Sequence, residues 1–293
     1  MTFELKKGEL RATAQTKGGE LVSLRDGEGQ EYIWPGDPAF WAGRNPILFP
    51  IVGTLKDGKV ELAGQVCEMG RHGFAREMEF TPVEQGEDFI TLELRETPDT
   101  LVRYPFPFAL RVTHRLLDDG FSTTFAVQNP GSSSMPFCIG GHTAIRCPLR
   151  EGERFEDYEL LFDVSEQADS HLLSPQGIIL QGRMEPMLRE GARLPLDYSV
   201  FQRLDTIIFS MLRSGNVSLL HKETGHGVRL DFHEFPMVAF WTKPGAPFLC
   251  MEPWQGCAAL EDETGRFKDK PHVITLSPGE GRDLTYTVTL AEG

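Results

Sequence analysis

The segment Asp119–Gln128, DGFSTTFAVQ, carries the clearest structural pattern in the sequence. Its apolar and β-branched side chains recur at every second position and share one face of a β-strand: Phe121, Thr123, Phe125 and Val127. The preceding Asp119-Gly120 pair tolerates the positive φ angles of a type I′ turn. This stretch therefore predicts a strand that enters from a tight hairpin.

The same alternation recurs along the chain, as at Ile90, Leu92 and Leu94, at Val228, Leu230 and Phe232, and at Leu284, Tyr286, Val288 and Leu290. Turn signals separate these runs at Lys17-Gly18-Gly19, Gly27-Glu28-Gly29, Gln85-Gly86, Ser214-Gly215-Asn216 and Thr224-Gly225. No linker or repeat divides the chain. The pattern predicts an all-β antiparallel body of two sheets, formed by residues 1–293 as a single domain.

Little helix is expected. The best candidates for short helices are Pro98–Tyr104 and Pro38–Gly43. The stretch Ser165–Leu196 has the least regular pattern, and we expect it to be rich in loops.

Composition narrows the class of protein. The chain has 293 residues and a net charge of −14, which argues against nucleic acid or an anionic membrane as its main partner. The N-terminus lacks the apolar region of a signal peptide, and the longest apolar runs, 46–52 and 236–241, are far shorter than a membrane span. The five cysteines form no CxxC pair, so we expect reduced, buried thiols and a cytoplasmic protein.

Four segments place polar side chains among apolar residues, glycine and proline: WAGRNPILFPIVG (41–53), GRHGFAR (70–76), MPFCIGGHTA (135–144) and PFLCMEPWQG (247–256). Binding and catalytic groups are often found in such surroundings. A carboxylate at the end of a run as apolar as the last one loses hydration, which raises its pKa toward the range of a useful base. Glu252 is that carboxylate, and His72 and His142 are the histidines of the second and third segments.

The chemistry of these segments suits a sugar. Aromatic rings stack on the C–H face of a sugar while polar groups bind its hydroxyls. The segments and their surroundings are rich in aromatic side chains, namely Trp34, Phe40, Trp41, Phe74, Trp241 and Trp254. Each single motif also has a structural interpretation: Arg44 paired with a surface carboxylate, His72 bonded to loop backbone, His142 as a core histidine, or Glu252 bound to backbone N–H groups.

Taken in order, RNPILFPIVG, RHGFAR, PFCIGGHTAI and FLCMEPWQG resemble the aldose 1-epimerase (galactose mutarotase) superfamily, and most of all its LacX-like branch. EYIWPGDPAFW and RLDTIIFSML (203–212) support the resemblance, which covers the chain from about residue 20 to its end. It implies a large antiparallel β-supersandwich with few short helices. It also implies a hexose mutarotase that works without metal or organic cofactor, as a monomer or homodimer.

The resemblance also implies roles for individual residues. Glu252 corresponds to the general base and His142 to the general acid. The substrate-binding residues that it implies, or that lie in the matching segments, are Arg44, His72, Asp205, Arg76 and Trp254.

Two other functions remain open from the sequence. A hexose-6-phosphate mutarotase would need a cationic cluster, for which Arg71, Arg76 and Lys56 are candidates. A non-catalytic sugar-binding or sensing protein could use the same scaffold. A metal site at His221, His226, Asp231 and His233 is a weaker possibility. Asp231 and His233 share the strand face opposite Val228, Leu230 and Phe232, so a solvated polar hairpin surface is the default interpretation.

Overall fold

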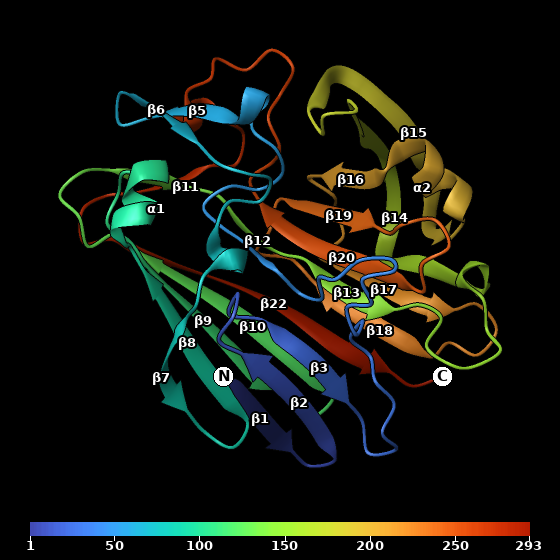
Figure 1. Cartoon of the computed structure of the whole chain (residues 1–293). Helices are drawn as coiled ribbons and strands as arrows, with labels where there is room; N and C mark the ends of the chain where they lie inside the picture. The colour runs from blue at the N-terminus through green and yellow to red at the C-terminus, as the bar shows by residue number, and fades with distance from the viewer.

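The computed structural model describes residues 1–293, and the strand pairs of its sheets are all antiparallel (Figure 1). This confirms the predicted all-β class. The larger sheet has nine strands, in the order β15 (Ile179–Pro195), β14 (Tyr158–Leu173), β17 (Asn216–His221), β18 (Gly227–Asp231), β22 (Gly281–Ala291), β10 (Gly120–Gln128), β9 (Ala109–Leu116), β8 (Phe89–Arg95) and β7 (Thr81–Gln85).

A six-stranded sheet lies against the middle of the larger one (Figure 1). Its order is β16 (Thr206–Ser210), β19 (Met237–Trp241), β20 (Phe248–Gln255), β12 (Ile139–Gly141) and β4 (Ile47–Leu48), and β13 (Thr143–Arg146) also pairs with β20. The other strands form a three-stranded sheet, β1 (Thr2–Lys7), β2 (Leu10–Gln15) and β3 (Leu21–Arg25), and two ribbons, β5 (Lys59–Leu62) with β6 (Gln65–Glu68) and β11 (Met135–Phe137) with β21 (Ile274–Leu276).

The core lies between the sheets. One cluster of 72 buried residues includes side chains from both large sheets. The alternating residues of β10 are buried as predicted, with Phe121, Thr123 and Phe125 each 0% exposed. Tyr286 of β22 joins the two sheets, because its hydroxyl lies 3.2 Å from the hydroxyl of Thr143 on β13.

The hairpin between β9 and β10 forms with a different turn from the predicted one. The Leu117 N–H donates to the Gly120 carbonyl (2.8 Å), so Asp118 and Asp119 occupy the turn. Neither Asp119 nor Gly120 has a positive φ. Gly120 instead lies directly against β22, where a Cβ would stand 2.0 Å from the Val288 carbonyl oxygen. The glycine therefore allows close strand approach rather than a left-handed turn.

The prediction that Ser165–Leu196 is rich in loops is wrong. Most of this stretch belongs to β14 and β15, the two longest strands, which pair with each other as a hairpin. Their register shifts at four places, including one between Leu161 and Glu166. These irregularities change which face each side chain occupies, so the sequence loses its period-two signal.

The helix predictions are half right. The helix α1 (Pro98–Arg103) forms where expected, with a capping box between Thr97 and Thr100. The segment Pro38–Gly43 makes only a turn, in which the Asp37 carbonyl accepts from the Phe40 and Trp41 N–H groups. A second helix, α2 (Tyr198–Leu204), was not predicted. No helix is both long and apolar enough to cross a bilayer.

Candidate active site

One pocket collects residues from all four of the sequence segments and from the middle of the six-stranded sheet. Its walls are Trp41, Gly53, Thr54, Arg71, His72, Arg76, His142, Leu173, Gly177, Thr206, Ile208, Trp241, Glu252, Trp254 and Ala258. Five of the seven site residues expected from the sequence line it: His142, Glu252, His72, Arg76 and Trp254. The structure therefore brings together groups that lie up to 182 positions apart in the chain, from His72 to Trp254.

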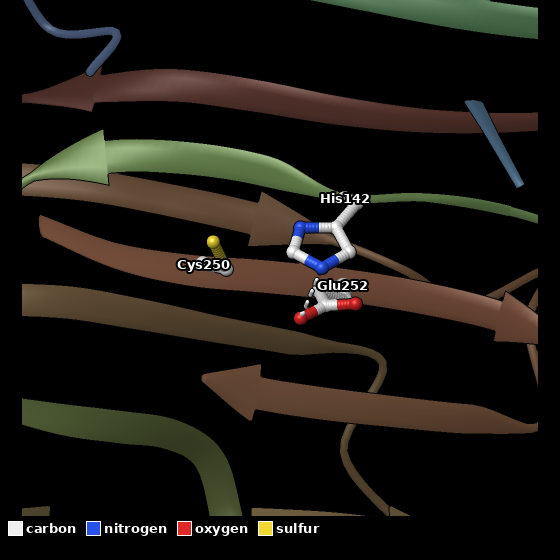
Figure 2. A group of neighbouring side chains, drawn as sticks. All are labelled: His142, Cys250 and Glu252. Carbon is white, nitrogen blue, oxygen red and sulfur yellow. Dashed lines mark ion pairs between the residues drawn. The ribbon is translucent and has the colours of Figure 1, made fainter. Parts of the chain in front are cut away.

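The centre of the pocket is an imidazole against a carboxyl group. His142 lies between β12 and β13, which both pair with β20, the strand that carries Glu252. The Nε2 of His142 is 3.3 Å from Oε1 of Glu252 (Figure 2). Both side chains are buried, with Glu252 1% and His142 7% exposed.

The two glycines before His142 allow this packing. A Cβ on Gly140 would stand 2.7 Å from the Pro253 carbonyl oxygen of β20, and one on Gly141 would stand 2.8 Å from the Tyr286 ring. Neither glycine has a positive φ. The glycines therefore provide close approach between strands, which holds His142 over the strand of Glu252.

Burial shifts the pKa values of the pair in opposite directions. Loss of hydration raises the pKa of Glu252 well above its usual 4.5, and the negative charge of Asp205 adds to this rise. Burial, together with the positive charges of Arg76 and Arg71, lowers the pKa of His142 to about 3. The Trp254 Nε1–H donates to Oε2 of Glu252 (3.2 Å) and opposes the rise by stabilising the carboxylate. Both shifts therefore favour the uncharged forms, a protonated Glu252 and a neutral His142.

His72 is held in one tautomer. Its Nδ1 accepts a hydrogen bond from the Gly53 N–H (3.1 Å), so the proton of the neutral ring lies on Nε2. Burial and the nearby His142 lower the pKa of His72 well below 6.5, so the ring stays neutral. Its backbone is left-handed, with φ at 67°, and its ring meets that of His142 edge-on at 5.5 Å between centroids. His72 therefore presents a neutral, oriented N–H donor.

Aromatic rings surround the imidazole of His142. The ring of Trp41 lies 5.0 Å from it and that of Trp241 lies 5.9 Å from it, centroid to centroid. Trp41 and Trp241 meet edge-on at 5.3 Å. Together with Trp254 these indoles supply flat apolar faces beside the polar groups, an arrangement suited to a small polar ring with a C–H face.

Two arginines give the pocket a positive charge in an otherwise acidic protein. The Nε of Arg71 donates to Thr54 Oγ1 (3.0 Å). The Nε of Arg76 is buried and has no hydrogen-bond partner, and Arg76 pairs only distantly with Glu77 (3.9 Å). Glu252 is the one acidic residue in the pocket wall. The arginines therefore have no close carboxylate partner inside the pocket.

Arg44 does not lie in the pocket, contrary to the sequence prediction. Its Nε donates to the Pro35 carbonyl (2.7 Å), and its side chain lines a separate surface depression with Arg146 and Glu31. The neighbouring Asn45 points inward and accepts a hydrogen bond from Thr143 (2.8 Å). The segment thus contributes to the site through Trp41, through Gly53 and through this buried bond.

Asp205 and Lys56 also lie outside the pocket wall. The Asp205 carboxylate accepts from the hydroxyl of Thr206 (2.9 Å), and Thr206 itself reaches the wall. Asp205 is nonetheless near enough to influence the pKa of Glu252. Lys56 donates to the Glu261 carbonyl (2.8 Å) in another surface hollow, so of the three candidate cations only Arg71 and Arg76 reach the pocket.

The sequence analysis did not predict the part of the pocket wall that Leu173 and Gly177 form. Leu173 and Gly177 come from the turn region of the β14–β15 hairpin, which was expected to be loop. Gly177 lies next to Arg71. A Cβ added to Gly177 would stand 2.7 Å from Nη2 of Arg71. No local signal marks these residues, because only the path of the long hairpin brings them to the pocket.

The rings of His221 and His226 stack at 5.2 Å between centroids, but these histidines do not form a group of three metal-ligating atoms with Asp231 and His233. His226 is buried against Tyr158, whose hydroxyl lies 3.0 Å from its Nε2, and against Glu153 at 3.2 Å. His233 pairs instead with Asp231. The five cysteines are all buried and unpaired, as predicted.

The fold and this pocket define a galactose mutarotase-like β-sandwich with a buried His–Glu pair. The model of the aldose 1-epimerase family matches residues 1–289, and the chain belongs to that family. It is 37% identical to the chromosomal LacX protein of Lactococcus lactis, with 99% of each chain covered.

Two solved structures are similar in fold as well as sequence. A galactose mutarotase related enzyme from Lactobacillus acidophilus has a TM-score of 0.92 at 26% identity, covering 99% of this chain and 97% of its own. A galactose mutarotase-like protein from Lactobacillus casei has a TM-score of 0.92 at 29% identity, covering 99% of this chain and 100% of its own.

Proposed function

We propose that this protein is an aldose 1-epimerase that interconverts the α and β anomers of a hexose. The observation that carries the proposal is the 3.3 Å contact between His142 Nε2 and Glu252 Oε1 in one pocket. Mutarotation needs a proton removed from the C1 hydroxyl and another donated to the ring oxygen. These two oxygens are bonded to the same carbon, so an acid and a base this close together can serve both.

The reaction proceeds by ring opening. Glu252 as the carboxylate takes the C1 hydroxyl proton, and His142 as the imidazolium donates a proton to the ring oxygen. The ring opens to the aldehyde, the C1–C2 bond turns, and the same two transfers in reverse close the ring on the other face. Each positioned acid or base contributes about 10²–10⁴ in rate.

Burial sets the starting state of this pair. In the free pocket the pKa shifts favour a proton on Glu252 and a neutral His142. Moving that proton across the 3.3 Å contact yields the carboxylate and imidazolium that the reaction uses. The Trp254 N–H bond to the carboxylate, and hydroxyl donors of a bound sugar, favour this charged form.

Other wall residues orient the sugar in this proposal. The Nε2–H of His72 donates to a sugar hydroxyl, and the indoles of Trp41, Trp241 and Trp254 stack on its C–H face. These contacts hold the hemiacetal in a fixed orientation beside the acid and the base, and such positioning raises the reaction rate.

Polarimetry of freshly dissolved α-D-glucose and α-D-galactose tests the proposal. The protein should speed mutarotation above the buffer rate, and Glu252→Gln and His142→Asn should each lower the rate at least about a hundredfold with the fold retained by circular dichroism. The matched control is His226→Asn, another buried histidine, outside the pocket, which should keep the wild-type rate. If the wild-type protein only tracks the buffer blank, the proposed catalysis is wrong, and a non-catalytic sugar-binding protein remains to be tested by a binding measurement.

A hexose phosphate is the second candidate substrate, favoured by Arg71 and Arg76 in the pocket wall. Guanidinium groups without a carboxylate partner inside the pocket wall suit a phosphate oxygen. Comparing the anomers of glucose and glucose 6-phosphate separates the two proposals. If the phosphate is the substrate, Arg71→Gln should lower kcat/KM for glucose 6-phosphate at least about tenfold while changing that for glucose little. Equal effects on both sugars would contradict a phosphate-binding role.

A further inference from the structure

A cysteine thiol lies beside the proposed acid and base and has no part in the reaction. Residues 250 and 252 are two positions apart on β20, so their side chains point to the same face of that strand. One ligand atom each from His142, Cys250 and Glu252 lies within 4.8 Å of the others. Figure 2 shows the three side chains grouped over β20, with the thiol beside the imidazole ring.

These donors are only partly engaged with the rest of the protein. The Nδ1 of His142 is buried and has no hydrogen-bond partner. The Cys250 side chain is 0% exposed within a small apolar cluster that includes Trp34 and Phe248. Oε2 of Glu252 accepts from Trp254, which leaves Oε1 directed at His142.

The donor set selects a class of metal. A nitrogen, a sulfur and a carboxylate oxygen form a mixed set of the kind that Zn²⁺ binds, whereas Mg²⁺ prefers oxygen ligands alone. Around a tetrahedral Zn²⁺ with bonds of about 2.0–2.3 Å, neighbouring ligand atoms lie roughly 3.3–3.6 Å apart. Donor atoms that lie up to 4.8 Å apart therefore need to approach one another by up to about 1.5 Å to reach this geometry.

We propose that His142, Cys250 and Glu252 form an inhibitory site for Zn²⁺ and similar borderline divalent cations. The metal takes one atom from each side chain, and the thiol proton and the carboxyl proton leave for solvent without any change in oxidation state. The thiolate and carboxylate balance the two positive charges. The fourth position stays open toward the pocket and holds water.

Such a metal occupies the groups that the sugar reaction needs. Zn²⁺ and the sugar therefore compete for the pocket, and this part of the inference rests on the proposed mutarotase function. Metal binding itself does not rest on it, because it depends only on the three donors. The two claims consequently have separate tests.

Cobalt substitution tests the binding claim without any activity measurement. Co²⁺ titrated into the reduced protein should saturate at one ion per chain, produce a thiolate-to-cobalt charge-transfer band in the near ultraviolet, and be displaced by Zn²⁺. Cys250→Ala should abolish the band, whereas Cys67→Ala, which removes another buried cysteine outside the pocket, should keep it. Absence of the band in the wild-type protein, or its persistence in Cys250→Ala, would overturn the proposal.

Two further variants keep the test decisive if Cys250→Ala does not fold. His142→Asn and Glu252→Gln each remove another ligand, and each should weaken Co²⁺ binding at least about tenfold. Unchanged affinity in both would show that the ion binds elsewhere and would overturn the site.

The inhibition claim is measured by polarimetry. Zn²⁺ should slow mutarotation competitively with the sugar, EDTA should restore the rate, and Mg²⁺ should have no effect. Relative to its own metal-free rate, Cys250→Ala should need at least about tenfold more Zn²⁺ for half inhibition. A cobalt band in a protein without mutarotation would refute the proposed function and leave the metal site standing. Mutarotation without a cobalt band would refute the metal site and leave the proposed function standing.

Discussion

At the scale of single residues, burial determines the chemistry of the site. Glu252 and His142 are ordinary side chains whose pKa values shift because the strands around them exclude water. The pKa of Glu252 rises and that of His142 falls, so burial favours the uncharged forms of both groups. An exposed glutamate and histidine would instead both be charged near pH 6.

This shift predicts a flat pH profile. The pKa of His142 is lowered to about 3 from 6.5. The neutral imidazole of His142 therefore does not become an imidazolium as the pH falls from about 7.5 to about 5. His72 is shifted in the same direction and stays neutral as well. We expect kcat/KM for mutarotation, measured by polarimetry, to show no histidine titration across this range and to fall in stronger acid, when His142 becomes protonated. A half-maximal drop near pH 6.5 would show that a catalytic histidine titrates as an exposed one.

At the scale of elements, close strand contacts position the site. The hairpin β9–β10 and the strand β22 form the middle of the nine-stranded sheet, and Tyr286 of β22 reaches Thr143 beside His142. Gly120 begins β10 opposite Thr289 of β22. A side chain there would collide with backbone, which cannot move aside as the end of a flexible side chain can.

Gly120→Ala should therefore destabilise the protein by about 1–3 kcal/mol or more. Its Cβ would stand 2.0 Å from the Val288 carbonyl oxygen. The matched control is Gly281→Ala, at the other end of the same strand pair, where the nearest atom is 3.4 Å away and the expected change is within about 0.5 kcal/mol. Chemical denaturation monitored by far-ultraviolet circular dichroism measures both. Similar effects in the two variants would contradict the argument from close packing.

At the scale of the whole molecule, the two large sheets share one core. The cluster of 72 buried residues includes side chains of both, such as Phe125 of β10 and Phe240 of β19. Neither sheet can leave this core without exposing the apolar face of the other, so their stabilities are coupled.

We therefore expect a single unfolding transition. Far-ultraviolet circular dichroism reports the strands, and tryptophan fluorescence reports the pocket through Trp41, Trp241 and Trp254. The two signals should have the same denaturation midpoint, and mutarotation should be lost over the same range. A pocket signal that disappears clearly before the strand signal would show that the six-stranded sheet unfolds separately.

Local pattern was sufficient for much of the fold and for the burial of the carboxyl group at position 252, whereas the pairing of Glu252 with His142 was expected only from the family resemblance. Period-two alternation predicted the strand at Phe121–Val127 because one face of it is buried, and the apolar run before Glu252 predicted a desolvated carboxyl group. These properties depend on neighbours within a few positions, and such neighbours are visible in a sequence.

Other features depend on contacts between distant segments, and only the tertiary structure decided them. The register shifts in β14 and β15 hid a hairpin whose turn region supplies Leu173 and Gly177 to the pocket. Arg44 bonds to Pro35 and faces away, whereas Arg71 and Arg76 reach the wall. The thiol of Cys250 stands beside His142 because β13 pairs with β20. The direction of a side chain and the identity of its distant partners follow from how the strands pack, and this packing is set by the whole chain at once.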